Sequence, residues 1–110
     1  MKKKIMITKA VIVNDNFIVS QEIEYIYQGQ IKVNCDAILK AFMASRSSEV
    51  EGGILYVTGC PDLADSGMVI AAKLSKVIYN RTAITSDEMC ALELLKEHDI
   101  EVIYNPNIIL

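Results

Sequence analysis

Two carboxylates and a thiol stand close together near the middle of the chain. Cys60 precedes Asp62 and Asp65, and the two aspartates are three residues apart. On a helix that spacing puts both side chains on the same face. Such carboxylates can contact a ligand or a hard cation, or they can complement the positive end of a helix dipole. Cys60 could serve metal or redox chemistry, or be a small, partly buried side chain.

Other residues suited to catalysis are sparse. The chain holds three cysteines, at positions 35, 60 and 90, without a Cys-x-x-Cys pair, and one histidine, His98. An odd cysteine count without a disulfide framework is typical of a reducing compartment. Cys90 has apolar neighbours, so we expect it in the core. We place His98 at a helix C-terminus, where a partial positive charge is favoured, and expect no serine or cysteine triad.

The composition predicts one globular domain over residues 1–110. The chain is 52% hydrophobic and 23% charged, which excludes intrinsic disorder. A formal net charge of −3 argues against binding of free duplex nucleic acid. No apolar stretch approaches the roughly 20 residues of a membrane span, and the lysines at 2–4 are not followed by a signal-peptide pattern. We therefore expect a soluble, cytoplasmic protein.

Hydrophobic periodicity and turn residues predict a β-β-α-β-α-β-α-β order. Two strands around the turn at 14–16 form a hairpin. A helix at 34–48 should bury the face formed by Ala37, Ala41 and Phe42. The remaining expected elements are a strand at 54–58 buried on both faces, a helix at 61–74, a strand at 76–79, a helix at 85–98 and a strand at 100–104. Helices alternating with strands predict a three-layer α/β/α sandwich with a mostly parallel sheet behind the hairpin.

In such sheets, sites gather where strands end and helices begin. Two expected helix N-termini, at 32–36 and 60–65, flank the strand at 54–58. Asn34 is suited to cap the first helix. We therefore place the candidate site between these two N-termini.

Three stretches resemble the cytidine and deoxycytidylate deaminase family. The segment Ile-Leu-Tyr-Val-Thr-Gly-Cys-Pro-Asp-Leu-Ala-Asp-Ser-Gly-Met at 54–68 is similar to the family's strand and Thr-x-x-Pro-Cys-x-x-Cys zinc motif. Residues 34–39 resemble the end of its His-Ala-Glu helix, and residues 93–102 resemble its C-terminal helix and strand. The resemblance covers about residues 10–104 and implies the deaminase fold with a mixed five-stranded sheet.

The departures fall on the chemical positions. The resemblance places the ligand histidine on Lys32, the proton-shuttling glutamate on Asn34, and the two ligand cysteines on Asp62 and Asp65. Zinc deamination requires those groups. The framework residues are kept, namely Ala37, Ile38, Pro61 and Gly67. The resemblance therefore implies a pseudoenzyme without zinc or another cofactor, and without catalytic residues.

The former zinc site is then a candidate ligand-binding site. Its expected residues are Lys32, Asn34, Cys60, Asp62 and Asp65. Each also has a simpler structural use, such as capping a helix or lying in a solvated loop. If the family's backbone geometry is kept, the Lys32 ammonium should lie within about 4 Å of Asp62 or Asp65.

Three functions remain open. The first is a non-catalytic protein that binds a protein partner or a nucleotide-like ligand. The second is a phage or mobile-element type of regulator or inhibitor that uses the fold as an interaction surface. The third is a divergent nucleotide deaminase or hydrolase that uses Asp62 and Asp65. A wide apolar patch would favour a partner, a deep pocket between the helix N-termini would favour a small ligand, and the resemblance implies a homo-oligomer.

Overall fold

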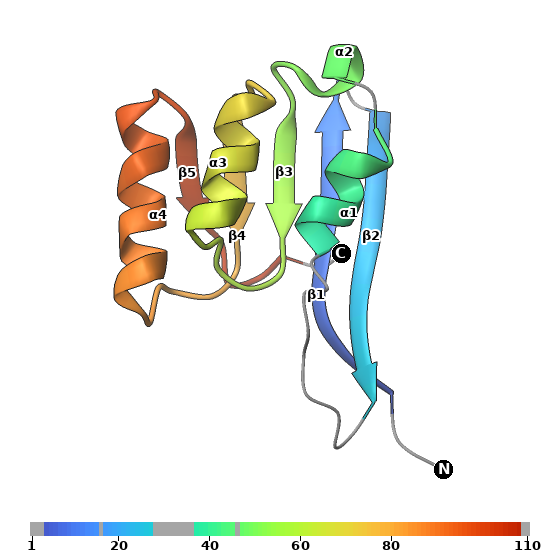
Figure 1. Cartoon of the computed structure of the whole chain (residues 1–110), viewed down its shortest axis with the longest axis vertical. Coiled ribbons are helices and arrows are strands. Elements are labelled where there is room, and N and C mark those ends of the chain that lie inside the picture. Colours follow the sequence, from blue (N-terminus) through green and yellow to red (C-terminus); the bar gives the residue numbers. More distant parts are fainter. Residues whose placement is uncertain (1–3, 16, 28–36, 46, 109–110) are drawn as a thin grey trace.

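The computed structural model describes residues 4–15, 17–27, 37–45 and 47–108. These residues form five strands and four helices (Figure 1). They are β1 (Lys4–Asn14), β2 (Phe17–Tyr27), α1 (Ala37–Met43), α2 (Ser47–Val50), β3 (Ile54–Val57), α3 (Leu63–Ala71), β4 (Lys76–Tyr79), α4 (Ser86–Glu97) and β5 (Glu101–Tyr104).

The strands form one mixed sheet in the order β2-β1-β3-β4-β5. The hairpin strands β1 and β2 pair antiparallel, as do β1 and β3, whereas β3, β4 and β5 are parallel. Asp15 in the hairpin turn has a φ of 51°, a conformation that aspartate tolerates. The predicted five-stranded sheet with an antiparallel hairpin is confirmed.

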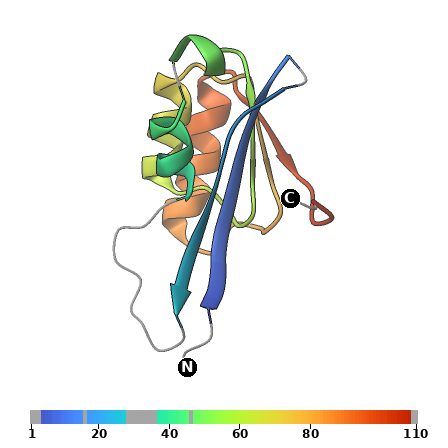
Figure 2. The same ribbon diagram turned by 90° about the vertical axis from the view of Figure 1, so that its right-hand side faces the viewer.

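The helices α1, α3 and α4 all cover one face of this sheet (Figure 2). The crossovers β3-α3-β4 and β4-α4-β5 step across the sheet in the same direction, and right-handed crossovers of that kind place both helices on one side. The predicted sandwich also had a helical layer on the opposite face. No such layer is found within the described ranges, so these form two layers.

The core lies between the sheet and the helices. Leu55 and Val57 of β3 point into it, while Ile54 and Tyr56 lie on the opposite face and are half-buried. The expectation that this strand is buried on both faces is therefore wrong, because none of the described helices lies over one of its faces. The other main core residues come from every layer: Ala10, Ile12, Ile38, Val69, Val77 and Leu95.

The helix predicted at 34–48 is shorter and divided. Within the described residues it consists of α1 and, after a turn, α2. The Ser45 hydroxyl donates to the Phe42 carbonyl oxygen at 3.0 Å and satisfies an acceptor in the last turn of α1. Ala37 and Ala41 are fully buried as expected, but Phe42 is only half-buried at the edge of the core.

None of the described helices combines the length and the apolar character needed to cross a bilayer.

Candidate functional site

Asp62 and Asp65 form a reciprocal cap at the start of α3. Asp62 Oδ1 accepts a hydrogen bond from the Asp65 backbone N–H at 2.9 Å, and Asp65 Oδ2 accepts one from the Asp62 N–H at 2.9 Å. Both carboxylates thereby satisfy backbone donors that a helix N-terminus otherwise leaves open. The structure thus gives these two residues a capping role, and Asp65 is buried in it.

Pro61 is fully buried just before this cap. We expected it at the first position of the helix, but Asp62 is the N-cap, so Pro61 precedes the cap by one residue. The shift follows from the aspartate pair, because a side chain that accepts from the N3 backbone defines the N-cap.

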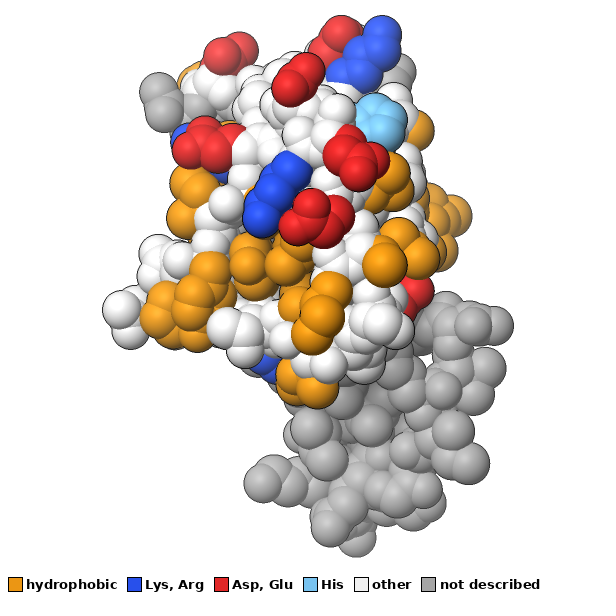
Figure 3. All heavy atoms as spheres, turned by 90° about the vertical axis from the view of Figure 1, so that its left-hand side faces the viewer, with side chains coloured by type: hydrophobic (Ala, Val, Ile, Leu, Met, Phe, Trp, Pro, Cys, Tyr) orange, Lys and Arg blue, Asp and Glu red, His pale blue; other side chains and the backbone are white. Residues whose placement is uncertain are grey.

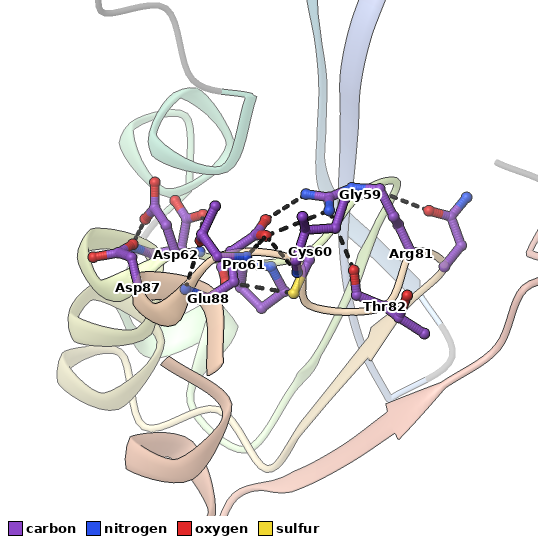
Figure 4. Close-up of polar contacts among 12 residues, drawn as sticks. Gly59, Cys60, Pro61, Asp62, Arg81, Thr82, Asp87 and Glu88 are labelled. Carbon is purple, nitrogen blue, oxygen red and sulfur yellow. Dashed lines mark hydrogen bonds and ion pairs between the residues drawn. The ribbon is translucent and has the colours of Figure 1, made fainter. Parts of the chain in front are cut away.

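The carboxyl ends of β3 and β4 are tied together beside this cap. The Gly59 N–H donates to Asn80 Oδ1 at 2.6 Å, and the Gly59 carbonyl oxygen accepts from the N–H groups of Asn80 and Arg81, each at 3.3 Å. Gly59 has a φ of 104°, which a side chain would strain. The turn holds Cys60 and Arg81 close to the helix N-termini (Figure 4).

Arg81 forms an ion pair with Glu88 in the first turn of α4. Both guanidinium Nη atoms contact the carboxylate, and the Arg81 Nη1 to Glu88 Oε1 distance is 3.4 Å. Glu88 Oε1 also accepts from the N–H groups of Ile84 and Thr85, at 3.0 and 3.2 Å. The Arg81 hydrogen bond, followed by these backbone donors, lowers the pKa of Glu88 to about 2. Glu88 is therefore ionised at neutral pH.

Cys60 lies just before the start of α3, near Glu88 and Arg81 (Figure 4). Burial, followed by the nearby Glu88 charge, raises the pKa of its thiol to about 11, although Arg81 acts in the opposite direction. At neutral pH this side chain is a neutral thiol, and its Sγ lies 3.7 Å from the Pro61 carbonyl oxygen. The thiolate needed for nucleophilic attack is therefore scarce there.

Helices α3 and α4 are joined at this end of the sheet. Asp87 Oδ2 accepts from the Leu63 N–H at 3.2 Å. The buried Ser66 hydroxyl lies 3.0 Å from the Asp62 carbonyl oxygen and 3.2 Å from that of Ala91. The two helix starts therefore form one hydrogen-bonded unit, which Figure 4 shows in part.

The sequence-predicted site is only partly within the described residues. Cys60, Asp62 and Asp65 are brought together as expected. Lys32 and Asn34 lie outside the described residues, so the Lys32 contact remains a prediction. His98 is the C-cap of α4, as expected, with Nδ1 3.0 Å from the Leu94 carbonyl oxygen. Cys90 is exposed, so its placement in the core is wrong: it lies on the outer face of α4.

Sequence reasoning missed the Arg81–Glu88 pair. The sequence pattern predicts a helix over 85–98 without singling out either residue, yet Glu88 is buried and pairs with Arg81. Two signals were present: Arg81 follows a strand that ends at the site, and Thr85-x-x-Glu88 has the spacing of a capping box.

The described residues at this site do not fit a zinc ion. No group of three or more His, Cys, Asp or Glu side chains that could hold a metal occurs in the described part of the chain. Asp62 Oδ1 and Asp65 Oδ2 face backbone donors, which leaves Cys60 without a converging set of ligands among the described residues. A structural or catalytic zinc site needs three or four deprotonated or neutral ligands that converge on one point.

No family model and no curated protein matches this sequence. Solved structures are similar to it. RibD of Acinetobacter baumannii superposes with a TM-score of 0.67 at 20% identity, over 88% of this chain and 28% of that one. The dCMP deaminase of cyanophage S-TIM5 in complex with dCMP and dUMP gives a TM-score of 0.70 at 19% identity, over 89% and 80%.

A diaminohydroxyphosphoribosylaminopyrimidine deaminase/5-amino-6-(5-phosphoribosylamino)uracil reductase from Thermotoga maritima is also similar. Its TM-score is 0.65 at 21% identity, and the match covers 88% of this chain and 29% of that one. This chain thus spans less than a third of the length of the two longer proteins. The sheet order, the crossovers and these superpositions together show that the chain has the cytidine deaminase-like α/β fold.

Proposed function

We propose that this chain is a non-catalytic protein of the deaminase fold that binds a protein partner. One observation carries the proposal. The acids at the starts of α3 and α4 are engaged in caps or an ion pair: Asp62, Asp65 and Asp87 accept backbone hydrogen bonds, and Glu88 pairs with Arg81. Acids held in this way stabilise the helix starts.

The acid-base properties of the site also favour a non-catalytic role. A deaminase needs an acid that exchanges protons near the operating pH, whereas the pKa of Glu88 is about 2. It also needs several thiolate or imidazole ligands that converge on one zinc ion, whereas Cys60 is the one cysteine that the described residues bring to this site. The described acid and thiol therefore do not supply the proton shuttle and the ligand set that zinc-dependent deamination needs.

The surface favours a partner over a small ligand. Several large apolar side chains are exposed near the α3–α4 side, including Leu63, Ile84 and Met89. Figure 3 shows hydrophobic side chains gathered on this side of the molecule. Exposed apolar groups that lie together commonly mark interaction surfaces.

The proposal is tested on purified protein by elemental analysis and by turnover. We expect no zinc to remain after dialysis against a chelator, and no deamination of cytidine, deoxycytidylate or single-stranded cytosine. One zinc per chain, or turnover that disappears in the Asp65→Ala variant, would refute the proposal in favour of a divergent deaminase. The Glu51→Ala variant, changed at an exposed turn, is the matched control.

Native mass spectrometry of the same sample separates the remaining alternatives. Saturable binding of dCMP or dUMP, weakened in the Arg81→Ala variant, would replace the protein partner with a nucleotide-like ligand. We expect no such complex. The same spectra report the oligomeric state and so test the predicted homo-oligomer.

A further inference from the structure

An open apolar groove lies on the outer surface where α4 passes the first residue of α3. Its volume is about 360 Å³, and it is lined by Leu63, Met89, Cys90, Glu93, Leu94 and Glu97. Leu63 and Met89 are 41% and 53% exposed. These two side chains thus leave much of their apolar surface in water.

The groove uses the face of α4 that the core leaves free. Its lining residues on α4 have the spacing of one helical stripe, and the opposite stripe, with Ala91 and Leu95, is buried against the rest of the fold. The outer stripe combines a methionine, a cysteine and a leucine. Methionine is common on surfaces that adapt to peptide partners.

The charged groups of the lining are all acidic. Glu93 and Glu97 are exposed and one helical turn apart, and no lysine or arginine is among the lining residues. Figure 3 shows acidic side chains beside hydrophobic ones along this side of the molecule, with Lys and Arg side chains also on this face. Lys96 belongs to the same helix but does not line the groove.

We propose that this groove docks a basic, amphipathic helical segment of a partner protein. Apolar side chains of that segment would cover Leu63, Met89 and Leu94, while its lysines or arginines, one turn apart, would reach Glu93 and Glu97. This is the helix-in-groove mode, with complementary charge fixing the orientation. The inference rests on the proposed function, since it names the surface and the chemistry of the partner.

A small molecule suits this groove less well. A ligand pocket usually encloses its ligand and places a few polar groups to orient it. Here the lining is open, and its polar side chains are two exposed carboxylates at the rim. An extended partner that brings its own cations matches this distribution better.

The probe is a fluorescein-labelled amphipathic peptide of leucine and lysine, measured by fluorescence anisotropy with the full chain. Two control peptides separate the contribution of charge from that of the apolar face. One has glutamate in place of lysine, and the other has the same composition as the probe but no apolar face. We expect saturable binding of the first peptide only. Equal binding of the scrambled peptide would overturn the proposal, because charge alone would then suffice.

Two variants place the binding in the groove. Glu93→Lys should weaken binding about tenfold, or about 1.4 kcal/mol, whereas the control Glu51→Lys makes the same charge change at the turn after α2 and should have little effect. Met89→Asp adds negative charge but removes an apolar contact, so we expect weaker binding. Stronger binding by Met89→Asp, or equal weakening by both lysine variants, would overturn the proposal.

Folding and self-association are checked on the same samples. Met89→Ser replaces Met89→Asp if the aspartate variant loses its circular-dichroism spectrum. A dimer of the unliganded chain that Met89→Ser dissociates would assign the groove to a second copy and overturn the peptide assignment. Zinc content and turnover are measured without peptide, so a failure of the proposed function is recognised separately from a failure of this docking site.

Discussion

The starts of α3 and α4 use the same capping device in different electrostatic settings. In α3 two aspartates cap each other's backbone, and in α4 Thr85 and Glu88 do so. The Glu88 carboxylate has further partners, since it also accepts from the Ile84 N–H and pairs with Arg81 from the end of β4. A capping box is local, but the Arg81 contact joins a helix to a strand end. We therefore expect Glu88 to matter more for stability than Asp62.

The largest expected effect is that of Glu88→Ala. The change removes the cap acceptor and leaves Arg81 without its carboxylate, so we expect a loss of about 2–3 kcal/mol. The value stays below that of a fully buried pair because the Arg81 side chain is 42% exposed and partly screened by water. Urea denaturation measures it, with the exposed Glu93→Ala on the same helix as control. A loss below about 0.5 kcal/mol would place Glu88 among ordinary surface acids.

The second prediction concerns pH. The pKa of Glu88 is about 2 in the fold, against 4.5 for an unperturbed glutamate. Its contribution to stability is therefore complete above the higher value and is lost as the pH falls toward the lower one. The full pKa difference corresponds to about 3.4 kcal/mol. Because water screens the exposed Arg81 side chain, we expect the stability difference between wild type and Glu88→Gln to shrink by about 2 kcal/mol over that range. Parallel stability curves for the two proteins would contradict the shift.

The smallest expected effect belongs to α3. Asp62→Ala removes an N-cap acceptor and should cost about 1 kcal/mol, whereas Asp62→Asn keeps an acceptor oxygen and should cost less. Thermal or urea unfolding distinguishes the two. A cost for Asp62→Ala that equals that of Glu88→Ala would remove the contrast between the helix starts. Equal costs for alanine and asparagine would show that the acceptor atom is not what matters.

The sequence was sufficient to predict the sheet and the start of α4 at Thr85. The alternation of helices and strands predicted the two crossovers between parallel strands. The turn residues Asn14 and Asp15 predicted the hairpin, because turn preferences are local signals. The division of the first helix was not predicted, because a serine hydroxyl bond to the Phe42 carbonyl oxygen competes with a helical pattern that otherwise continues. The expected second helical layer is also missing from the described residues, since the face that a helix covers depends on the hand and direction of its crossover.

The candidate site was predicted in position but not in chemistry. Asp62 and Asp65 were found through a family motif, and their role as mutual caps follows from a spacing that the sequence already contains. The Arg81–Glu88 pair depends on how the end of β4 meets α4, and no local pattern specifies that contact. Cys90 was misplaced because its apolar neighbours in sequence belong to different faces of the helix.

The hairpin's pairing has a consequence for how the chain meets other chains. Strand β2 is an edge of the sheet, and its register with β1 shifts between Met6 and Thr8 and again between Ile12 and Val13. At the second shift Val19 of β2 has no partner across the ladder. A long flat edge is a template for cross-chain strand addition, and bulges twist such an edge out of register. The irregular pairing thus protects the hairpin from growing into a continuous intermolecular sheet.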